Sequence, residues 1–178
     1  NLSLNSFKDI SLKSSLQYSI IKTHLGDFGI FVNKRALTKI VLPNKLKLIA
    51  LEPTHKNQYF LIMKEVRVQL EQYFQGDLKY FNLKTDFHIS LFYKKALKAV
   101  GKIPYATTKS YKEVANNIGS PNGHRAVANA NAKNPIPIVI PCHRVIKSNG
   151  ELGGYGGGSK LKKDLLKFER TNINLKAH

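Results

Sequence analysis

Residues 134–145 read NPIPIVIPCHRV, and this stretch decides more about the chain than any other. Its prolines at 135, 137 and 141 remove backbone N–H donors and hold the chain extended. Apolar residues stand between them, which predicts a rigid, buried segment rather than a solvated loop. The segment ends at Cys142, His143 and Arg144, three neighbouring side chains that suit thiol chemistry.

Cys142 is the only cysteine of the chain. It therefore forms no intramolecular disulfide and no zinc site made of thiolates. Two interpretations stay open: a small buried apolar residue beside a structural histidine, or a nucleophile. A thiol is nucleophilic as the thiolate, which a nearby imidazole favours. Neighbours in an extended chain point apart, so His143 would need a bend or a bridging water to act on Cys142.

The composition indicates a folded protein with a polyanionic partner. The 178 residues include 29 Lys and Arg against 11 Asp and Glu, a formal net charge of +18. Such a charge fits DNA or RNA, and the alternative is a solubilising lysine coat. The apolar fraction of 42% excludes a disordered chain. The longest apolar run, residues 59–63, is far shorter than the roughly 18 residues of a membrane span. With no signal peptide in residues 1–6, we expect a cytoplasmic protein, or a nuclear one in a eukaryote.

The first 86 residues predict a small mixed or antiparallel sheet with one helix. A hairpin is expected in residues 15–32, turning at Gly26 and Asp27, with a third strand at 37–42. Apolar residues that include Leu61 and Val68 recur at helical spacing over residues 57–74, which predicts a helix. Gly76 is expected to end it. A short strand is expected at residues 80–83.

Residues 87–178 predict a mainly helical domain. An amphipathic helix is expected over about thirteen residues up to Val100. Ser110 and Glu113 have the spacing of a capping box that begins a second helix. Ser120 and Pro121 suggest the start of a third helix, which continues through residues 125–130. The close pair suggests a DNA-binding helix-turn-helix or an ordinary helical hairpin. The predicted fold class is α+β (α/β).

Two further features follow the cysteine. The glycines within residues 153–158 let backbone amides approach a ligand closely, whereas a phosphate-binding P-loop would need a Lys-Ser/Thr pair that is missing. Glu169 follows the apolar positions Leu165 and Phe168 on a predicted helix. It is therefore either partly buried with a partner, or a surface glutamate paired with Lys162 or Lys163.

The pentapeptide 141–145, PCHRV, closely resembles the signature of the O6-alkylguanine-DNA alkyltransferases, also called methylated-DNA–protein-cysteine methyltransferases. The same family order and spacing is found at five other places: Ser110-Tyr111, Arg125-Ala126-Val127, Asn134-Pro135, the glycines at 153–158, and Leu165-Leu166 with Glu169. This resemblance is specific over residues 88–170. In the N-terminal half it rests on Gln72-Tyr73-Phe74 followed by Gly76.

The resemblance implies five catalytic roles. Cys142 would accept the alkyl group from guanine O6 and keep it. His143 would take the thiol proton through a water, and Glu169 would hold the imidazole tautomer. Tyr111 would give a proton or hydrogen bond to the departing guanine, and Asn134 would brace the turns behind the site.

The resemblance also implies a DNA-binding set. Arg125 would fill the space left by a base flipped out of the duplex, and Ala126 would allow close approach to the groove. Tyr155 would wall the pocket. The remaining residues expected to bind substrate or DNA are Ser110, Arg144, Gly156 and Gly157. The chain departs from the family pattern in having no tryptophan, and in Ala106-Thr107-Thr108 and Ala128-Asn129. These departures concern the rate and the lesion range.

The function that the resemblance implies is direct, stoichiometric repair of O6-alkylguanine in double-stranded DNA by a monomer. No metal, no cofactor and no membrane partner are expected. One alternative is a non-catalytic sensor that binds alkylated bases, although such relatives replace the cysteine. Another is a cysteine hydrolase of small substrates, which would leave the net charge and Arg125 without a role.

Overall fold

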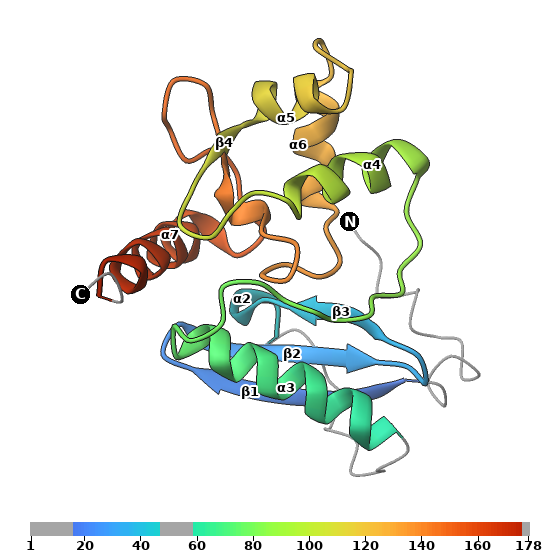
Figure 1. Cartoon of the computed structure of the whole chain (residues 1–178). Helices are drawn as coiled ribbons and strands as arrows, with labels where there is room; N and C mark the ends of the chain where they lie inside the picture. The colour runs from blue at the N-terminus through green and yellow to red at the C-terminus, as the bar shows by residue number, and fades with distance from the viewer. Residues whose placement is uncertain (1–15, 47–58, 176–178) are drawn as a thin grey trace.

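The structure of the chain is a computed structural model that describes residues 16–46 and 59–175. It has a sheet-containing N-terminal half and a mainly helical C-terminal half (Figure 1), which confirms the predicted fold class. In chain order the elements are β1 (Gln17–Thr23), β2 (Gly26–Val32), β3 (Leu37–Val41), α2 (Pro43–Leu46), α3 (Phe60–Phe74), α4 (Leu91–Val100), β4 (Lys109–Ser110), α5 (Tyr111–Asn117), α6 (His124–Ala132), the 3-10 helix η3 (Cys142–Arg144), β5 (Val145–Ile146) and α7 (Gly158–Leu175). Residues 1–6, which carry the signal-peptide expectation, lie outside the described ranges.

The three N-terminal strands form an antiparallel sheet in the order β1-β2-β3. The predicted hairpin is present, but the position of its turn was wrong. Thr23 pairs with Gly26, so the turn is His24-Leu25 and Gly26 begins β2. The Thr23 hydroxyl donates to the Gly26 carbonyl (2.7 Å) and accepts from the Leu25 amide (3.1 Å). The Thr23 side chain therefore stabilises a turn that lies two residues before the predicted turn at Gly26 and Asp27.

Helix α3 covers one face of the sheet (Figure 1), and its buried residues are Met63, Val66, Leu70, Tyr73 and Phe74. The predicted apolar face was partly wrong, because Leu61 is 78% exposed and Val68 is also exposed. The helix ends as predicted before Gly76, whose φ of +81° suits glycine.

The strand predicted at residues 80–83 is absent from the structure. Asn82 instead exchanges two hydrogen bonds with the side chain of Gln69, at 2.8 and 3.0 Å. The backbone of Asn82 is therefore satisfied by a helix side chain and not by a neighbouring strand.

The helical half confirms one predicted helix start and corrects another. The capping box is formed: the Glu113 amide donates to Ser110 Oγ (3.1 Å) and the Ser110 amide donates to Glu113 Oε2 (2.7 Å). Helix α6 begins at His124 and not at Ser120, because residues 120–123 form a turn closed by a hydrogen bond from the Gly123 amide to the Ser120 carbonyl (2.7 Å). Helix α5 and helix α6 pack against each other across this turn.

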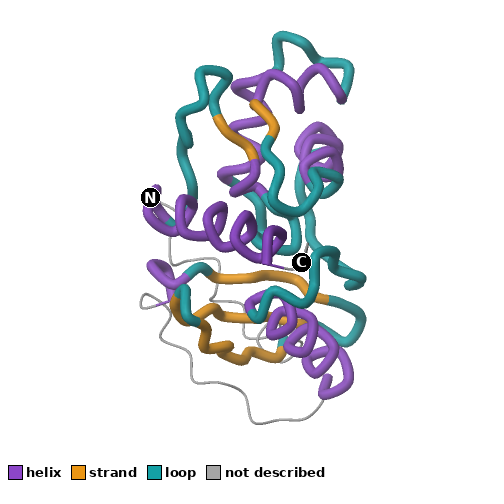
Figure 2. Tube along the Cα trace, turned by 60° about the vertical axis from the view of Figure 1, so that its left-hand side comes forward, coloured by secondary structure: helices purple, strands orange, loops and turns teal. Residues whose placement is uncertain are grey.

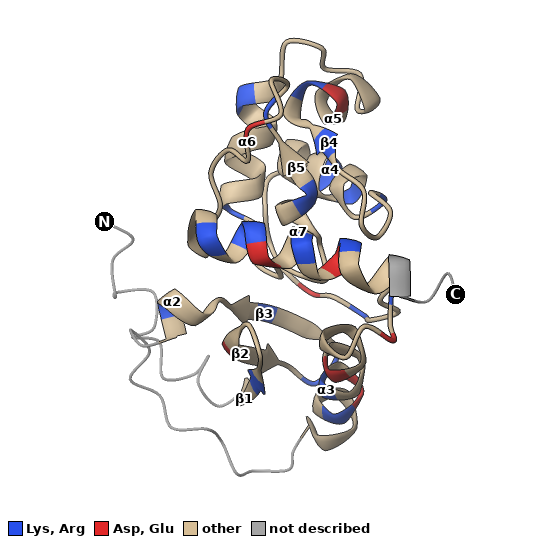
Figure 3. Cartoon of the chain, turned by 90° about the vertical axis from the view of Figure 1, so that its left-hand side faces the viewer, with Lys and Arg blue, Asp and Glu red and all other residues tan. Residues whose placement is uncertain are grey.

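Helix α7 lies between the sheet and the other helices of the C-terminal half (Figures 2 and 3). Its Leu165 joins a core cluster that also contains Ile30, Leu70 and Ile138. The two halves are further linked by a hydrogen bond from the Ile40 amide to the Pro135 carbonyl (2.9 Å). The division at residue 86 stays a prediction, and the main core includes residues from both sides of it.

In the described ranges, no helix is both long and apolar enough to cross a membrane. Lysine and arginine residues are distributed over helices of both halves (Figure 3).

Candidate active site

The thiol of Cys142 lies at the start of the single turn η3, which supplies the bend that an extended chain would lack. Cys142 is buried, with 6% of its surface exposed. The Asn134 side-chain amide donates to Cys142 Sγ (3.1 Å) and to the Ile140 carbonyl (2.8 Å). Its oxygen accepts from the Ile136 amide (3.1 Å). Asn134 therefore ties the thiol to the two turns behind it.

Behind the thiol, His143 and Arg144 converge on the carboxylate of Glu169. His143 Nε2 lies 2.9 Å from Glu169 Oε1. Arg144 donates from Nε to Oε2 (3.0 Å) and from Nη2 to Oε1 (2.8 Å). All three side chains are buried. The surface ion pair of Glu169 with Lys162 or Lys163 is therefore wrong, and burial with partners is confirmed.

The Glu169 carboxylate also receives two donors that the sequence analysis missed. Tyr73 Oη donates to Oε1 (2.7 Å) and the Ala106 amide donates to Oε2 (3.1 Å). Burial alone would raise the pKa of Glu169, but the hydrogen bonds and charges of His143 and Arg144 lower it to about 2. The carboxylate is therefore ionised at neutral pH and holds Arg144 and His143 in fixed orientations.

The imidazole of His143 has one nitrogen engaged and one available. Nδ1 is buried and has no hydrogen-bond partner among the described residues. Burial lowers the pKa of His143, against the opposing effect of Glu169, so the ring is neutral at pH 7. With Nε2–H directed at Glu169, the Nδ1 lone pair is free to accept a proton.

Lys162, which the sequence analysis considered only as a possible surface partner of Glu169, lies inside the protein. It is fully buried, and its ammonium donates to the carbonyl oxygens of Val145 (2.6 Å), Leu152 and Gly154 (3.3 Å). Burial lowers the pKa of Lys162 to about 8, although Cys142 acts in the opposite direction. Lys162 lies one helical turn before Leu165 and Leu166. Nothing in this sequence pattern indicates that its ammonium group donates hydrogen bonds to backbone carbonyl groups.

The thiol itself is held protonated in the resting protein. Burial raises the pKa of Cys142, and the hydrogen bond from Asn134 and the charge of Lys162 offset part of this effect. The site therefore needs a base to form the thiolate, and His143 is the adjacent candidate.

Tyr111, at the start of α5, reaches toward the glycine loop. Its Oη lies 3.5 Å from the Gly154 carbonyl, and a side chain at Gly153 would lie 3.1 Å from Oη. Burial and then the nearby Cys142 raise the pKa of Tyr111, so the phenol keeps its proton. The structure thus brings Tyr111 to the Cys142 side of the loop.

The residues predicted to contact DNA or substrate lie in different environments. Arg125 is exposed in the first turn of α6, next to the half-buried Ala126, and makes no ion pair with any described residue. Ser110 is buried as the cap of α5, and Arg144 is buried beside Glu169. For these two residues the geometry shows structural contacts and no exposed surface for DNA.

A small pocket of about 110 Å³ opens beside Cys142. Tyr155 and Gly156 form part of its wall, together with Leu42 and Lys45 from the N-terminal half. Gly157 lies just behind, where a Cβ would meet Leu161 at 2.6 Å and Tyr155 at 3.0 Å. A side chain there would require the Leu161 and Tyr155 side chains to shift.

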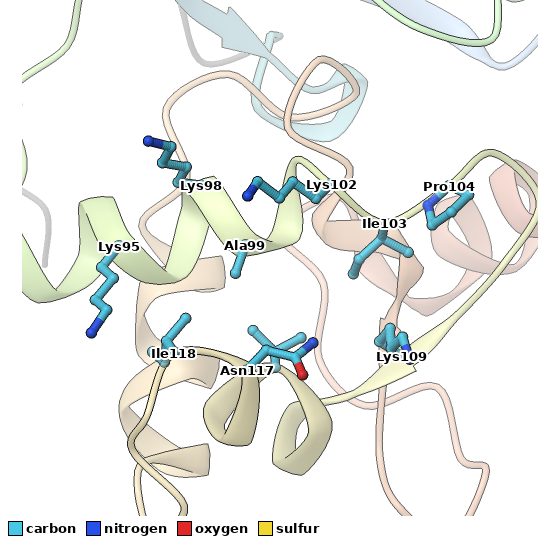
Figure 4. A pocket seen from close by; sticks show the side chains of 10 residues that line it. Lys95, Lys98, Ala99, Lys102, Ile103, Pro104, Lys109, Asn117 and Ile118 are labelled. Atoms are coloured by element: carbon cyan, nitrogen blue, oxygen red, sulfur yellow. The ribbon is translucent and has the colours of Figure 1, made fainter.

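A larger groove of about 470 Å³ lies elsewhere, between α4 and α5 (Figure 4). Ile103, Ala99 and Ile118 form its floor, and lysines such as Lys95 and Lys102 form its rim. Cys142 does not line this groove, so pocket size does not locate the chemistry. The smaller pocket beside the thiol is the better match to a compact substituent.

The predicted absence of a metal stays a prediction. Within residues 16–46 and 59–175, no three His, Cys, Asp or Glu side chains come together as metal ligands would.

The fold and the site define an α+β protein in which two short helices, α5 and α6, pack together and a thiol, an imidazole and a carboxylate are buried. Comparison with known proteins gives the family. The profile described as "6-O-methylguanine DNA methyltransferase, DNA binding domain" matches residues 91–171. A second, "6-O-methylguanine DNA methyltransferase, ribonuclease-like domain", matches residues 16–87. The chain belongs to the O6-methylguanine DNA methyltransferase family.

Individual relatives agree. The methylated-DNA–protein-cysteine methyltransferase of Methanosarcina barkeri is 40% identical over 159 residues, which cover 89% of this chain and 99% of that relative. The Mycolicibacterium paratuberculosis protein of the same name is 49% identical over 104 residues, 58% of this chain and 63% of that protein. Among solved structures, Mycobacterium tuberculosis OGT in complex with DNA has a TM-score of 0.75 and 35% identity, over 87% of this chain and 93% of that one. The family resemblance seen in the sequence, and the assignment as an enzyme, are confirmed.

Proposed function

We propose that the chain repairs O6-alkylguanine in double-stranded DNA by moving the alkyl group onto its own Cys142 in a single, irreversible transfer. The observation that carries the proposal is the buried array itself. Cys142 Sγ faces a small pocket with Asn134 at 3.1 Å, and the adjacent His143 is oriented by Glu169 at 2.9 Å. The names of the relatives and the DNA complex of the M. tuberculosis protein support the substrate class.

The proton leaves the thiol first. His143 Nδ1, which is buried and without a partner among the described residues, accepts the Cys142 proton through one bridging water. The positive imidazolium that results is stabilised by the ionised Glu169. Lys162 acts on the other partner of the proton transfer, because its charge favours the thiolate of Cys142.

The transfer then exchanges one bond for another. The thiolate attacks the carbon attached to guanine O6, an S–C bond forms, and the C–O6 bond breaks with its electron pair going to the guanine. The guanine receives a proton or hydrogen bond from Tyr111, whose raised pKa keeps the phenol protonated until then. The product is an S-alkylcysteine, a thioether that is stable in water, so each chain is expected to act once.

The base must leave the duplex to reach a thiol that is 6% exposed. Arg125 stands exposed at the start of α6, where it would fill the space left in the stack, and the half-buried Ala126 would permit close approach. The net charge of +18 would neutralise phosphates, so binding is expected to weaken steeply with salt.

The test is a titration of damaged duplex with protein, followed by digestion of the DNA and measurement of the O6-methylguanine that remains. The expected loss is linear in added protein and stops at one lesion per chain, and Cys142→Ser removes none. Removal of many lesions per chain would overturn the single transfer.

A second candidate function is a sensor that binds the alkylated base without reaction. One observation favours it: burial raises the pKa of Cys142, so the resting thiol is not activated. In the same titration a sensor would bind the damaged duplex and leave every lesion in place.

A further inference from the structure

We propose that the groove between α4 and α5 is a docking site for an acidic segment of a partner protein, in which aspartate or glutamate residues flank an aromatic or aliphatic anchor. The groove shares no lining residue with the pocket beside Cys142. The inference therefore goes beyond the proposed function, because it concerns a partner other than DNA and a surface other than the site of transfer.

The floor of the groove is apolar and preformed. Ala99 and Ile103 form its α4 side, and Val114 and Ile118 form its α5 side (Figure 4). All four belong to the core cluster of the helical half or pack against it, so their side chains are fixed before any partner arrives. The volume of about 470 Å³ lies within the range of roughly 300–1,000 Å³ that ligand pockets show. The floor can therefore receive an apolar side chain without rearrangement.

The rim of the groove carries positive charge that the described part of the chain does not neutralise. Lys95, Lys98 and Lys102 are exposed, and none of them forms an ion pair with a described residue. Helix α4 itself contains no acidic residue. Like charges one turn apart on a helix repel each other, and an acidic partner would remove that repulsion. Lys109, on the α5 side, is already paired with Glu113 (3.2 Å), so the unpaired charge lies on the α4 side.

The spacing of these lysines describes the partner segment. Lys95 and Lys102 are seven positions apart, which is about 10 Å along a helix axis. An extended peptide covers that length with about three residues. Acidic residues on both sides of a short anchor would thus reach both lysines while the anchor contacts Ala99. Asn117 lines the opposite wall, and its amide can donate to and accept from a peptide backbone.

The lysines alone would suit DNA phosphates as well, and two observations favour a protein segment. No residue of α6, the helix that carries Arg125, lines the groove. Phosphate groups would neutralise the rim but leave the apolar floor without a partner, whereas an apolar anchor gains free energy there. The net charge of +18 attracts any acidic molecule, so the floor is the feature that selects one.

The experiment measures the fluorescence anisotropy of a labelled peptide, Asp-Asp-Phe-Leu-Asp-Asp, titrated with the full chain. One control peptide, Asp-Asp-Ser-Ser-Asp-Asp, keeps the charge and lacks the anchor. A second, Asn-Asn-Phe-Leu-Asn-Asn, keeps the anchor and lacks the charge. We expect the peptide without the anchor to bind about tenfold more weakly, the effect of exposing one apolar side chain. The peptide without charge is expected to bind more weakly as well.

Variants locate the binding. The double variant Lys95→Gln with Lys98→Gln is expected to weaken binding of the first peptide by about fivefold, as for two exposed ion pairs. Lys22→Gln with Lys64→Gln removes the same charge from exposed positions of β1 and α3. That matched control is expected to change the affinity by less than about twofold, because salt screens distant charges. Ala99→Gln places a longer neutral side chain on the floor, and it should weaken binding of the anchored peptide only.

Three outcomes would overturn the docking site. Equal losses in the two double variants would mean that the net charge alone attracts the peptide. Equal affinity for the peptides with and without the anchor would mean that the floor is not used. Complete displacement of the peptide by undamaged duplex, with an equal loss of duplex affinity in the Lys95 and Lys98 double variant, would assign these lysines to DNA. None of these results depends on transfer to Cys142, so the proposed function is tested separately.

Discussion

Replacing Glu169 by Gln is expected to destabilise the folded protein by about 3–5 kcal/mol, the usual effect of breaking a buried ion pair. The carboxylate accepts hydrogen bonds from Tyr73, His143, Arg144 and the Ala106 amide. A Gln side chain has only one oxygen that accepts hydrogen bonds. Its NH₂ group would therefore lie against a donor that now binds a carboxylate oxygen. Arg144, which is also buried, would lose its countercharge.

The measurement is urea denaturation at pH 7, followed by a signal that does not depend on tryptophan, such as tyrosine fluorescence or circular dichroism. At about 2–4 °C per kcal/mol for a chain of this size, the same change lowers the melting temperature by roughly 6–20 °C. Glu71→Gln is the control, because its carboxylate is exposed and, among the described residues, forms an ion pair only with Arg67 (3.3 Å). That control is expected to change the free energy of unfolding by less than about 1 kcal/mol.

A change below about 1 kcal/mol in Glu169→Gln would refute the reasoning. It would mean that Arg144 reaches solvent or another acceptor when the charge is removed, and that the buried array does not depend on the carboxylate.

Three further predictions concern the same array. Tyr73→Phe removes one hydrogen bond to an ionised group, and we expect a loss of about 2 kcal/mol in urea denaturation; an unchanged midpoint would show that this bond contributes nothing. Because the folded pKa of Glu169 is about 2, below the ordinary value near 4.3, its stabilising effect is complete above about pH 4.3 and is lost as the pH falls toward 2. It amounts to about 3 kcal/mol, and the difference in melting temperature between wild type and Glu169→Gln should shrink over that window; a constant difference would contradict the assignment. Burial raises the pKa of Cys142, so iodoacetamide should modify it at pH 7 more slowly than it modifies a free cysteine. Equal rates would show an exposed or already ionised thiol.

Local patterns predicted the elements whose causes are local. The capping box at Ser110 and Glu113 needs only residues three apart, and it is present as expected. The start of α6 was misplaced because Ser120 and Pro121 fit the same local rule, while the competing turn closed by Gly123 and Ser120 carries no comparable sequence pattern.

The candidate site was predictable only in part, because some of its contacts join residues that lie far apart in the sequence. The family resemblance identified Cys142, His143 and Asn134, which lie within nine residues of one another in the sequence. Tyr73 meets Glu169 across 96 residues, and the Lys45 side of the pocket comes from the other half of the chain. No periodicity or spacing encodes such contacts, because they exist only after the sheet and α7 pack together.

Lys162 shows the same limit at a single position. A lysine on a helix with charged neighbours is ordinarily solvated. Here the loop of residues 152–154 folds over it, and three carbonyl groups replace water around its ammonium group. Only the path of that loop makes the lysine a buried residue.

The most direct test of the account is peptide mapping by mass spectrometry after the chain reacts with duplex DNA that carries one O6-methylguanine. The account predicts one added methyl group per chain, on the peptide that contains Cys142, and none in Cys142→Ser. A methyl group on any other residue, or an unmodified Cys142 after the lesion has disappeared from the DNA, would contradict it.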